Sequence, residues 1–504
     1  MRTFLAITAF VLTAVVPART GVYHVAPDGL DTNPGTLVQP FKTITKAVSV
    51  SVAGDTILLR GGSYTLTSPV SISKKGNASA RYHLFAYPGE RPLLDFSSMP
   101  VSGSNRGFNF SGHYWHVRGL DVKGAGDNGM NLSGSNNVIE FCSFFENRDT
   151  GLQMGGGASN NTVINCDAYY NADPGNGNAD GFAAKLDVGT GNTFVGCRAW
   201  QNSDDGWDGY LRGANDVRTT YDRCWVFRNG YLKDGSPSSG NGNGFKMGGG
   251  DTSNVSNWAH HVTMTRCIAY GNRVKGFDQN NNAGSMVLIN CTGYGNGTNY
   301  SIIRPLRAAD SAVVTNGVSL GIHGSLNGFV RQDHNSWTIP VETTEQDFVS
   351  VDAALLTAPR AADGSLPEIG FLRPAQGSDL IDAGIDAGLP FFGAAPDLGA
   401  FETEYTSWVR ESPSVPAAVT LHQNHPNPFN PETVIEFVPH RSGDAVLTVT
   451  DMLGRRVEEP FRGPVTAGVR YRVRFSGRDL SSGVYLYSVR SGGTVQSRRM
   501  LLMR

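Results

Sequence analysis

Short apolar runs rich in β-branched and aromatic residues recur along most of the chain, separated by Gly- and Asn-rich segments. The clearest runs are NNVIEFCSF, NNTVINCDAY, NTFVGCRAW, HVTMTRCIAY and MVLINCTGY. No helical period of any length competes with them. The pattern therefore predicts many short, buried β-strands joined by turns.

The six cysteines mark an internal repeat, because each is followed by an aromatic residue three positions on and by an asparagine five positions on. Successive cysteines are 24, 31, 27, 43 and 24 residues apart, so the unit has about 24 residues with insertions. Short β-rich units of this size are typical of a solenoid, here a parallel β-helix. The repeated residues are Cys142, Cys166, Cys197, Cys224, Cys267 and Cys291, with Asn147, Asn171, Asn202, Asn229, Asn272 and Asn296.

The repeat predicts the interior of the solenoid. Each coil should bury one thiol, which behaves as a small hydrophobe. The asparagines should form a ladder of amide hydrogen bonds, because a buried turn must satisfy its polar groups. Disulfides between neighbouring coils remain an alternative, since stacking brings like positions ~5 Å apart. The segment from Tyr23 predicts a strand and a helix that cap the first coil.

Composition divides the chain into four parts. Residues 1–18 contain an apolar run, Phe4 to Val16, and a small residue, Ala18, and they read as a signal peptide. A membrane anchor is the alternative, but a span needs ~20 apolar residues. The β-helix domain should cover 19–402, with LIDAGIDAGLPFFGAAPDLGAFE as its last turns, followed by a Pro/Ser linker at 403–417. Residues 418–504 alternate like the strands of a small immunoglobulin-like β-sandwich.

Charge is distributed unevenly between these parts. The whole chain has a formal net charge of −2, whereas residues 418–504 hold twelve arginines, no lysine and seven acids. The overall balance does not suit a nucleic-acid-binding protein. No segment after the first is long and apolar enough to span a membrane, and we expect a monomer.

Acids concentrate in the stretch NSDDGWDGY, which contains Asp204, Asp205 and Asp208. A Gly–aromatic pair that recurs from coil to coil sets the register of this region; the pairs are Gly181-Phe182, Gly206-Trp207, Gly244-Phe245 and Gly276-Phe277. In this register Asp180 and Asp205 precede the glycine. Asp208 and Lys246 both lie two residues after it.

Equivalent positions on stacked coils converge, so the four acids should crowd together at one edge. Each close pair of carboxylates costs about 3–4 kcal/mol at an effective dielectric of ~20, and Ca²⁺ with its six to eight oxygen ligands would offset that cost. Capping of turns by individual aspartates is the alternative. Zinc does not suit the cluster, because no His or Cys joins it.

Lys246 lies one coil beyond the acids, and a solvated lysine in a weak salt bridge is the simplest interpretation. Beside a bound dication, its pKa should fall, and the neutral amine could act as a general base. Lys185 and Lys275 are the competing lysines, but neither shares the register of Asp208.

The runs NADGFAAKL, GCRAWQNSDDGWDGY and GNGFKMGG resemble polysaccharide lyase family 9, the pectate lyases and related pectin-backbone lyases. The resemblance implies a right-handed parallel β-helix of about ten coils. It also implies that Asp180, Asp204, Asp205 and Asp208 bind Ca²⁺ and that Lys246 is the catalytic base. The reaction would be β-elimination, in which Lys246 removes the C5 proton of a galacturonate and the C4–O4 bond breaks.

Several questions stay open within this resemblance. Arg212 and Arg273 are candidates for holding substrate carboxylates. The substrate could be polygalacturonate or rhamnogalacturonan. An inverting hydrolase with Asp204 and Asp205 as paired carboxylates, a uronate epimerase and a non-catalytic surface protein that binds carbohydrate are further alternatives.

Residues 418–504, with NHPNPFNPET and the basic end SRRMLLMR, resemble the C-terminal sorting domain of the type IX secretion system. This resemblance implies export across an outer membrane by the secretion machinery, so that the protein is secreted or attached to the cell surface. An accessory domain that only packs or binds carbohydrate is the alternative.

Overall fold

The computed structural model describes residues 20–250, 258–404, 419–451 and 454–503. The predicted signal peptide and nearly all of the predicted linker lie outside these residues. Contacts divide the chain into two compact units, Met1–Tyr405 and Thr406–Arg504. Within the described residues, no helix is long and apolar enough to cross a membrane.

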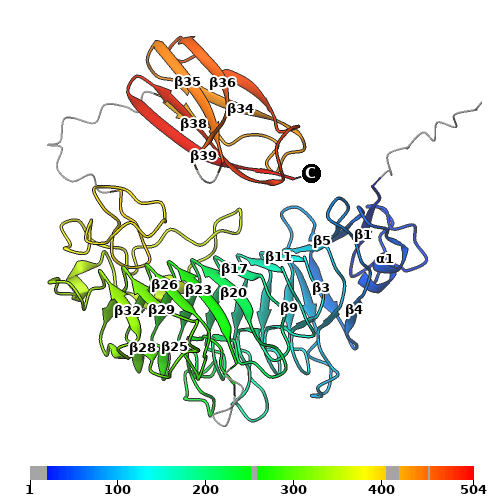
Figure 1. The fold of residues 1–504 in the computed structure, drawn as a ribbon. Coiled ribbons are helices and arrows are strands. Elements are labelled where there is room, and N and C mark those ends of the chain that lie inside the picture. Colours follow the sequence, from blue (N-terminus) through cyan, green and yellow to red (C-terminus); the bar gives the residue numbers. More distant parts are fainter. Residues whose placement is uncertain (1–19, 251–257, 405–418, 452–453, 504) are drawn as a thin grey trace, which may run out of the picture. The chain divides into compact units, whose positions relative to one another are not determined.

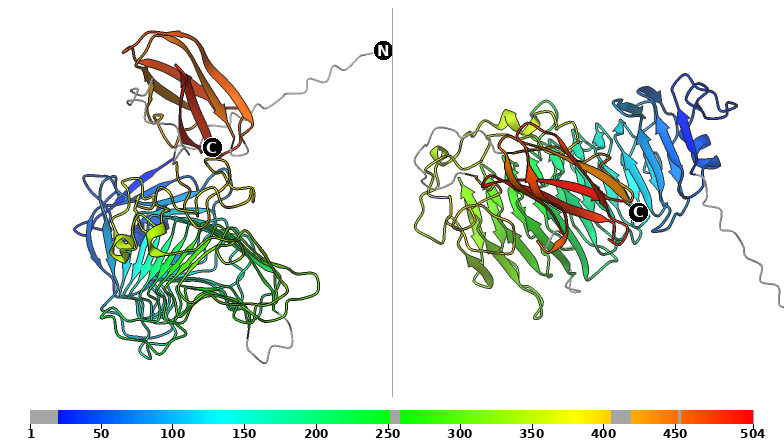
Figure 2. Two further views of the ribbon diagram at one scale, coloured as in Figure 1. Left: turned by 90° about the vertical axis from the view of Figure 1, so that its left-hand side faces the viewer. Right: turned by 90° about the horizontal axis from the view of Figure 1, so that it is seen from above.

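In its described residues, the first unit is a solenoid of three parallel sheets with twelve, ten and ten strands (Figure 1). Each complete coil contributes one short strand to each sheet, and β1 and β32 extend the first sheet at its two ends. In a view along the stack the coils lie over one another (Figure 2). The predicted parallel β-helix of about ten coils is confirmed, since the second and third sheets have ten strands each.

The strands of each sheet follow in chain order. The first sheet contains β1 (Val22–Val25), β2 (Thr56–Leu59), β5 (Tyr82–Ala86), β8 (Trp115–Arg118), β11 (Val138–Glu140), β14 (Thr162–Ile164), β17 (Asn192–Val195), β20 (Val217–Asp222), β23 (His260–Thr265), β26 (Met286–Ile289), β29 (Ala312–Thr315) and β32 (Val330–Asp333). The second contains β4 (Val70–Ile72), β7 (Phe108–Phe110), β10 (Met130–Leu132), β13 (Leu152–Met154), β16 (Phe182–Ala184), β19 (Trp207–Asp208), β22 (Phe245–Lys246), β25 (Lys275–Asp278), β28 (Thr298–Ile302) and β31 (Gly324–Leu326). The third contains β3 (Gly62–Thr65), β6 (Pro92–Asp95), β9 (Asp121–Lys123), β12 (Ser143–Phe145), β15 (Asp167–Tyr169), β18 (Arg198–Trp200), β21 (Trp225–Phe227), β24 (Ile268–Tyr270), β27 (Thr292–Tyr294) and β30 (Val318–Leu320).

The interior follows the repeat that the sequence shows. All six cysteines are buried and free, so the disulfide alternative is wrong. The amide ladder is confirmed: the side chain of Asn147 donates to Asn171 over 2.9 Å, and Asn171 donates to Asn202 over the same distance. The ladder continues in this way through Asn296.

The predicted cap of the first coil is present. Helix α1 (Ile44–Val50) begins after Thr43, whose side chain accepts a hydrogen bond from the backbone of Lys46 at 3.1 Å. Ile44, Ala47 and Val48 of this helix are buried in the solenoid core. The helix therefore shields the apolar end of the stack, which an uncapped solenoid would expose.

The segment after β32 differs from the expected last turns of the solenoid. It belongs to the same unit, but its described residues form the short 3-10 helices η1 (Glu345–Asp347) and η2 (Ala353–Thr357) instead of further coils. Its apolar side chains pack on Trp225 and Phe227 of the third sheet. Arg360 pairs with Asp167 at 2.7 Å. The segment therefore covers the aromatic side chains of the third sheet.

The second unit has two small antiparallel sheets, which agrees with the predicted sandwich. One contains β33 (Val419–Leu421), β34 (Glu432–Pro439) and β37 (Tyr471–Ser476); the other contains β35 (Gly443–Thr450), β36 (Arg456–Val465), β38 (Gly483–Ser491) and β39 (Thr494–Leu502). Buried side chains from both sheets share one core.

Candidate active site

The aromatic ladder of the second sheet places the predicted site residues. Phe182, Trp207 and Phe245 stack inside the solenoid with ring centroids 4.9 and 5.1 Å apart. Successive side chains of a strand point to opposite faces, so the next residue on each strand points outward. Asp208 and Lys246 are these outward residues, and they are register partners on β19 and β22. The register inferred from the Gly–aromatic pairs is therefore correct.

The turn before each of these strands carries a second row of acids. The backbone N–H of Asp205 donates to the Asp180 carboxylate at 3.2 Å, and that of Asn243 donates to Asp205 at 2.8 Å. Gly206 allows this turn to pack closely, because a Cβ there would lie 2.0 Å from Cγ2 of Val226. Each acid is thus oriented by the backbone of the next coil.

Three of the four predicted metal ligands converge. One carboxylate oxygen from each of Asp180, Asp204 and Asp205 lies within 4.8 Å of the others, and all three side chains are buried. Asp208 lies beside this triad, where its carboxylate meets Lys185 and Lys246, each at 3.4 Å.

Burial of these acids in one place disfavours their charged forms. Burial, with Asp208 and Asp204 nearby, raises the pKa of Asp180 to about 7 against the opposing effect of Lys185. Burial also raises the pKa of Asp205 well above its usual value. At Asp208 burial acts in the same direction, but Lys246 and Lys185 outweigh it and lower the pKa. Asp180 and Asp205 therefore have too little positive charge nearby to offset their burial, whereas the two lysines offset the burial of Asp208.

A hard dication fits this set of ligands. Every donor is an oxygen, as Ca²⁺ prefers. Oδ2 of Asp205 is buried and, among the described residues, accepts no hydrogen bond; it lies 3.1 Å from the Lys246 ammonium. A buried carboxylate oxygen without a donor carries a desolvation cost, which a cation at this point would remove.

Lys246 is nine-tenths buried among acids, and its Nζ also lies 5.9 Å from the centre of the Tyr210 ring. Burial lowers its pKa, but Asp205 and Asp208 outweigh burial and hold the pKa well above its ordinary value. The sequence led us to expect a lowered pKa beside a dication. With carboxylates alone around it, the lysine is instead held as the ammonium.

Lys185 belongs to the site although it does not share the register of Asp208. It directly follows β16, and its side chain extends toward the acids, so that its Nζ lies 2.6 Å from Asp180 and 3.4 Å from Asp208. The sequence named it only as a competitor of Lys246. Lys275 instead pairs with Asp278 of its own strand at 2.9 Å and is a third exposed.

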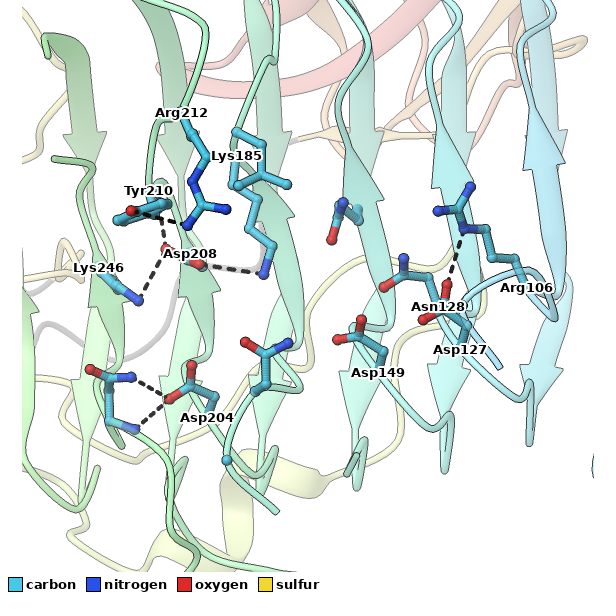
Figure 3. Close-up of a pocket in the computed structure, with 16 residues that line it drawn as sticks. Arg106, Asp127, Asn128, Asp149, Lys185, Asp204, Asp208, Tyr210, Arg212 and Lys246 are labelled. Carbon is cyan, nitrogen blue, oxygen red and sulfur yellow. Dashed lines mark hydrogen bonds and ion pairs between the residues drawn. The ribbon is translucent and has the colours of Figure 1, made fainter. Parts of the chain in front are cut away.

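Asp204 of the triad, Asp208 and both lysines line a cavity of about 560 Å³ on the outer face of the second sheet (Figure 3). Asp180 and Asp205 lie fully buried behind this lining. Asn241 lies in the cavity wall and donates its side-chain amide to Asp204 at 2.8 Å. It comes from the insertion between β21 and β22, and sequence reasoning missed it because no repeat position corresponds to it.

The two predicted substrate arginines differ in placement. Arg212 lines the cavity, and its guanidinium lies 3.4 Å from the Tyr210 hydroxyl. Arg273 is not part of the described lining. Its guanidinium donates to the carbonyl of Gly240, so it supports the insertion that carries Asn241.

Comparison with known proteins identifies the family. The family model described as Pel9A-like, right handed beta helix region, matches residues 23–316. Pectate lyase L of Dickeya chrysanthemi is 40% identical over 395 residues, which are 76% of this chain and 90% of that protein. The crystal structure of pectate lyase Pel9A matches with a TM-score of 0.71 and 38% identity over 76% of this chain and 96% of that one. A structure titled rhamnogalacturonan lyase matches with a TM-score of 0.64 and 28% identity over 71% and 97%.

These matches confirm the expected right-handed coil and the expected enzyme class, a polysaccharide lyase. They cover the solenoid, where the acids and lysines of the cavity lie. The chain therefore belongs to the Pel9A-like right-handed β-helix family.

Proposed function

We propose that this protein is a Ca²⁺-dependent pectate lyase that cleaves polygalacturonate by β-elimination, with Lys246 as the base. The observation that carries the proposal is the position of Lys246. Its Nζ is held 3.1 Å from Asp205 and 3.4 Å from Asp208, and Lys246 lines the same cavity as Asp204 of the carboxylate triad. Relatives named pectate lyase support the same activity.

The acids, Asn241 and Arg212 would have separate roles. Asp180, Asp204 and Asp205 would hold the cation, with Asp208 beside them and Asn241 fixing the orientation of Asp204. When bound, Ca²⁺ would neutralise a uronate carboxylate, make its C5 proton more acidic and offset the carboxylate charge that keeps Lys246 protonated. Arg212, at the cavity wall, would meet a substrate carboxylate.

The bond changes follow from the position of the base. Lys246 in its neutral form takes the C5 proton, the electron pair forms the C4–C5 double bond, and the C4–O4 bond breaks. The leaving O4 takes a proton from solvent, and Lys246 returns the C5 proton to solvent. The products are a 4,5-unsaturated uronate and a chain end with a free hydroxyl, so no net water is consumed. Tyr210 supports the geometry, because its backbone N–H donates to Asp208 at 2.9 Å.

Charge balance is consistent with one dication. Four carboxylates and two protonated lysines, Lys185 and Lys246, leave the site two charges negative. Lys185 lies against Asp180 and Asp208, and its pKa is raised by these carboxylates against the opposing effect of burial. Because Lys185 makes the shorter contact, 2.6 Å to Asp180 against 3.1 Å from Lys246 to Asp205, we assign Lys185 the role of a permanent counter-ion and Lys246 that of the lysine that exchanges its proton.

Rhamnogalacturonan is the second candidate substrate, and the match to a rhamnogalacturonan lyase favours considering it. The insertion YLKDGSPSSGNGNG, between β21 and β22, borders the cavity through Asn241. Its shape would decide which polymer backbone enters.

We further propose that residues 1–18 direct export and that the C-terminal unit is a type IX sorting domain. The support is the apolar run from Phe4, the motif NHPNPFNPET and the small sandwich with its arginine-rich composition. The enzyme would then be secreted or attached to the outer cell surface. Detection of the enzyme in the medium, with and without residues 418–504, tests this.

The test of the activity is the ultraviolet absorbance of the unsaturated product on polygalacturonate, with Ca²⁺ and then with chelator. We expect a Ca²⁺-dependent signal that falls by about 10²–10⁴-fold in Lys246→Ala, as for the loss of a general base. Lys275→Ala, one coil away, is the matched control and should keep the signal. New reducing ends without absorbance would indicate hydrolysis, and neither signal on either pectin backbone would indicate a binding protein.

A further inference from the structure

A second group of polar side chains lies in the same cavity, on the coils that precede the triad. Asp127, Asn128 and Asp149 all line the cavity wall. Met130 and Leu152 are register partners on β10 and β13. Asp127 and Asp149 each lie three residues before these partners, so they occupy equivalent positions on adjacent coils, spaced ~4.8 Å apart.

The two carboxylates are unequally compensated. Asp127 accepts a hydrogen bond from Arg106 at 3.0 Å. Asp149 accepts the backbone N–H of Thr150 at 2.8 Å, and within the described ranges it has no ion-pair partner at salt-bridge distance. Burial and the neighbouring Asp127 raise the pKa of Asp149 to about 6, although Lys185 acts in the opposite direction. Asp127 thus has Arg106 as its counter-ion, whereas Asp149 has no cation at salt-bridge distance among the described residues.

Asn128 supplies an independent observation. Its side chain is 3% exposed, and in the described part of the chain its Oδ1 accepts no hydrogen bond. In Figure 3 its amide projects into the cavity together with the carboxylates of Asp127 and Asp149. A buried carbonyl oxygen that lacks a donor is costly unless something positive meets it.

We propose that Asp127, Asn128 and Asp149 form a second site for a hard divalent cation such as Ca²⁺. The oxygens of two carboxylates and one amide are ligands that Ca²⁺ takes, and waters or a substrate carboxylate would complete its six to eight positions. The part of the proposal that concerns substrate rests on the proposed function. There, the cation binds a further uronate carboxylate of the polymer.

The row of equivalent positions explains why a second cation is needed. Leu152, Phe182 and Trp207 are register partners on successive coils. The residues three positions before them, Asp149, Ala179 and Asp204, therefore occupy equivalent positions. Asp149 and Asp204 are therefore about two coil spacings, ~10 Å, apart. One ion cannot reach both groups, and without a second ion a polyanion lying along the cavity would meet the Asp149 carboxylate, which has no ion-pair partner among the described residues.

The experiment is calorimetric titration of CaCl₂ into the full chain after treatment with chelator. The variant D127N/D149N should bind one equivalent fewer than wild type, and Asp205→Asn should lose a different equivalent, so that the triple variant loses both. Glu368→Gln, a highly exposed surface acid, is the matched control. Asn128→Asp adds a carboxylate and should tighten the second site at least about tenfold.

Wild-type stoichiometry in D127N/D149N would overturn the second site. Unchanged or weaker binding in Asn128→Asp would also overturn it, and this variant decides the matter if the double variant does not fold. The KM for polygalacturonate should rise about tenfold in D127N/D149N, as for one lost charge-assisted contact; an unchanged KM would overturn the substrate part. A wild-type protein that binds the extra equivalent but yields no unsaturated product would reject only the proposed function.

Discussion

Lys185→Met should destabilise the site coils strongly when no divalent cation is present. The lysine side chain is 9% exposed and the Asp180 side chain is fully buried, with 2.6 Å between Nζ and Oδ2. Removing one partner of a buried pair costs about 3–5 kcal/mol, because the remaining charge stays buried without compensation. Methionine has a similar length and is apolar, so lost packing contributes little to the difference.

Unfolding in urea, followed by tryptophan fluorescence in the presence of chelator, measures this effect. Trp200, Trp207 and Trp225 lie on the coils that surround the site and report their unfolding. Lys275→Met is the matched control, since the Lys275 side chain is a third exposed and its pair with Asp278 should contribute at most about 1 kcal/mol. Ca²⁺ at 100 times its Kd should stabilise the variant by about 3 kcal/mol. The loss relative to wild type should shrink, because the site without the lysine charge binds Ca²⁺ more tightly.

Equal losses in the Lys185 and Lys275 variants would refute this reasoning, because the burial of the first pair would then carry no energetic consequence. A loss that Ca²⁺ does not reduce would refute the view that a cation can replace the lysine charge. A loss of stability that is larger in the Lys185 variant and appears only with chelator would support both the energetic role of the buried pair and the replacement of the lysine charge by Ca²⁺.

Three further predictions follow from local geometry. Gly206→Ala should destabilise the solenoid by about 1–3 kcal/mol in thermal unfolding, since the new methyl would lie 2.0 Å from a valine methyl, whereas Gly328→Ala, with open space around it, should not. Asn241→Ala should weaken Ca²⁺ binding about 10–100-fold in calorimetry, because Asn241 orients a carboxylate of the triad; unchanged affinity would contradict that role. Burial and the neighbouring Asp397 raise the pKa of Glu402 from 4.5 to about 7, so the folded state binds the proton more tightly and stability should fall as pH rises from about 4.5 to 7. Glu402→Gln should flatten this fall, and an identical pH profile would refute the assignment.

Much of the solenoid could be predicted because its information is local and repeated. Cysteine, aromatic residue and asparagine return at fixed offsets, and each offset places a side chain inside the coil or in its turn. The same logic placed Asp208 opposite Lys246, since both follow a buried aromatic residue by one position. The earlier coils were harder to align, because Met130 and Leu152 stand where later coils have an aromatic residue. The Asp127 and Asp149 pair therefore went unnoticed.

The sequence by itself determined the fold class, the register of the second sheet and the residues Asp180, Asp205, Asp208 and Lys246 as neighbours. Stacking forces equal positions of successive coils together, so spacing along the chain is enough to establish these contacts. Only the tertiary structure decided that Lys185 reaches the same carboxylates, that Asn241 meets Asp204 and that the segment after β32 covers the third sheet. These contacts join parts of the chain with no shared repeat position, and their geometry depends on packing that no local spacing encodes.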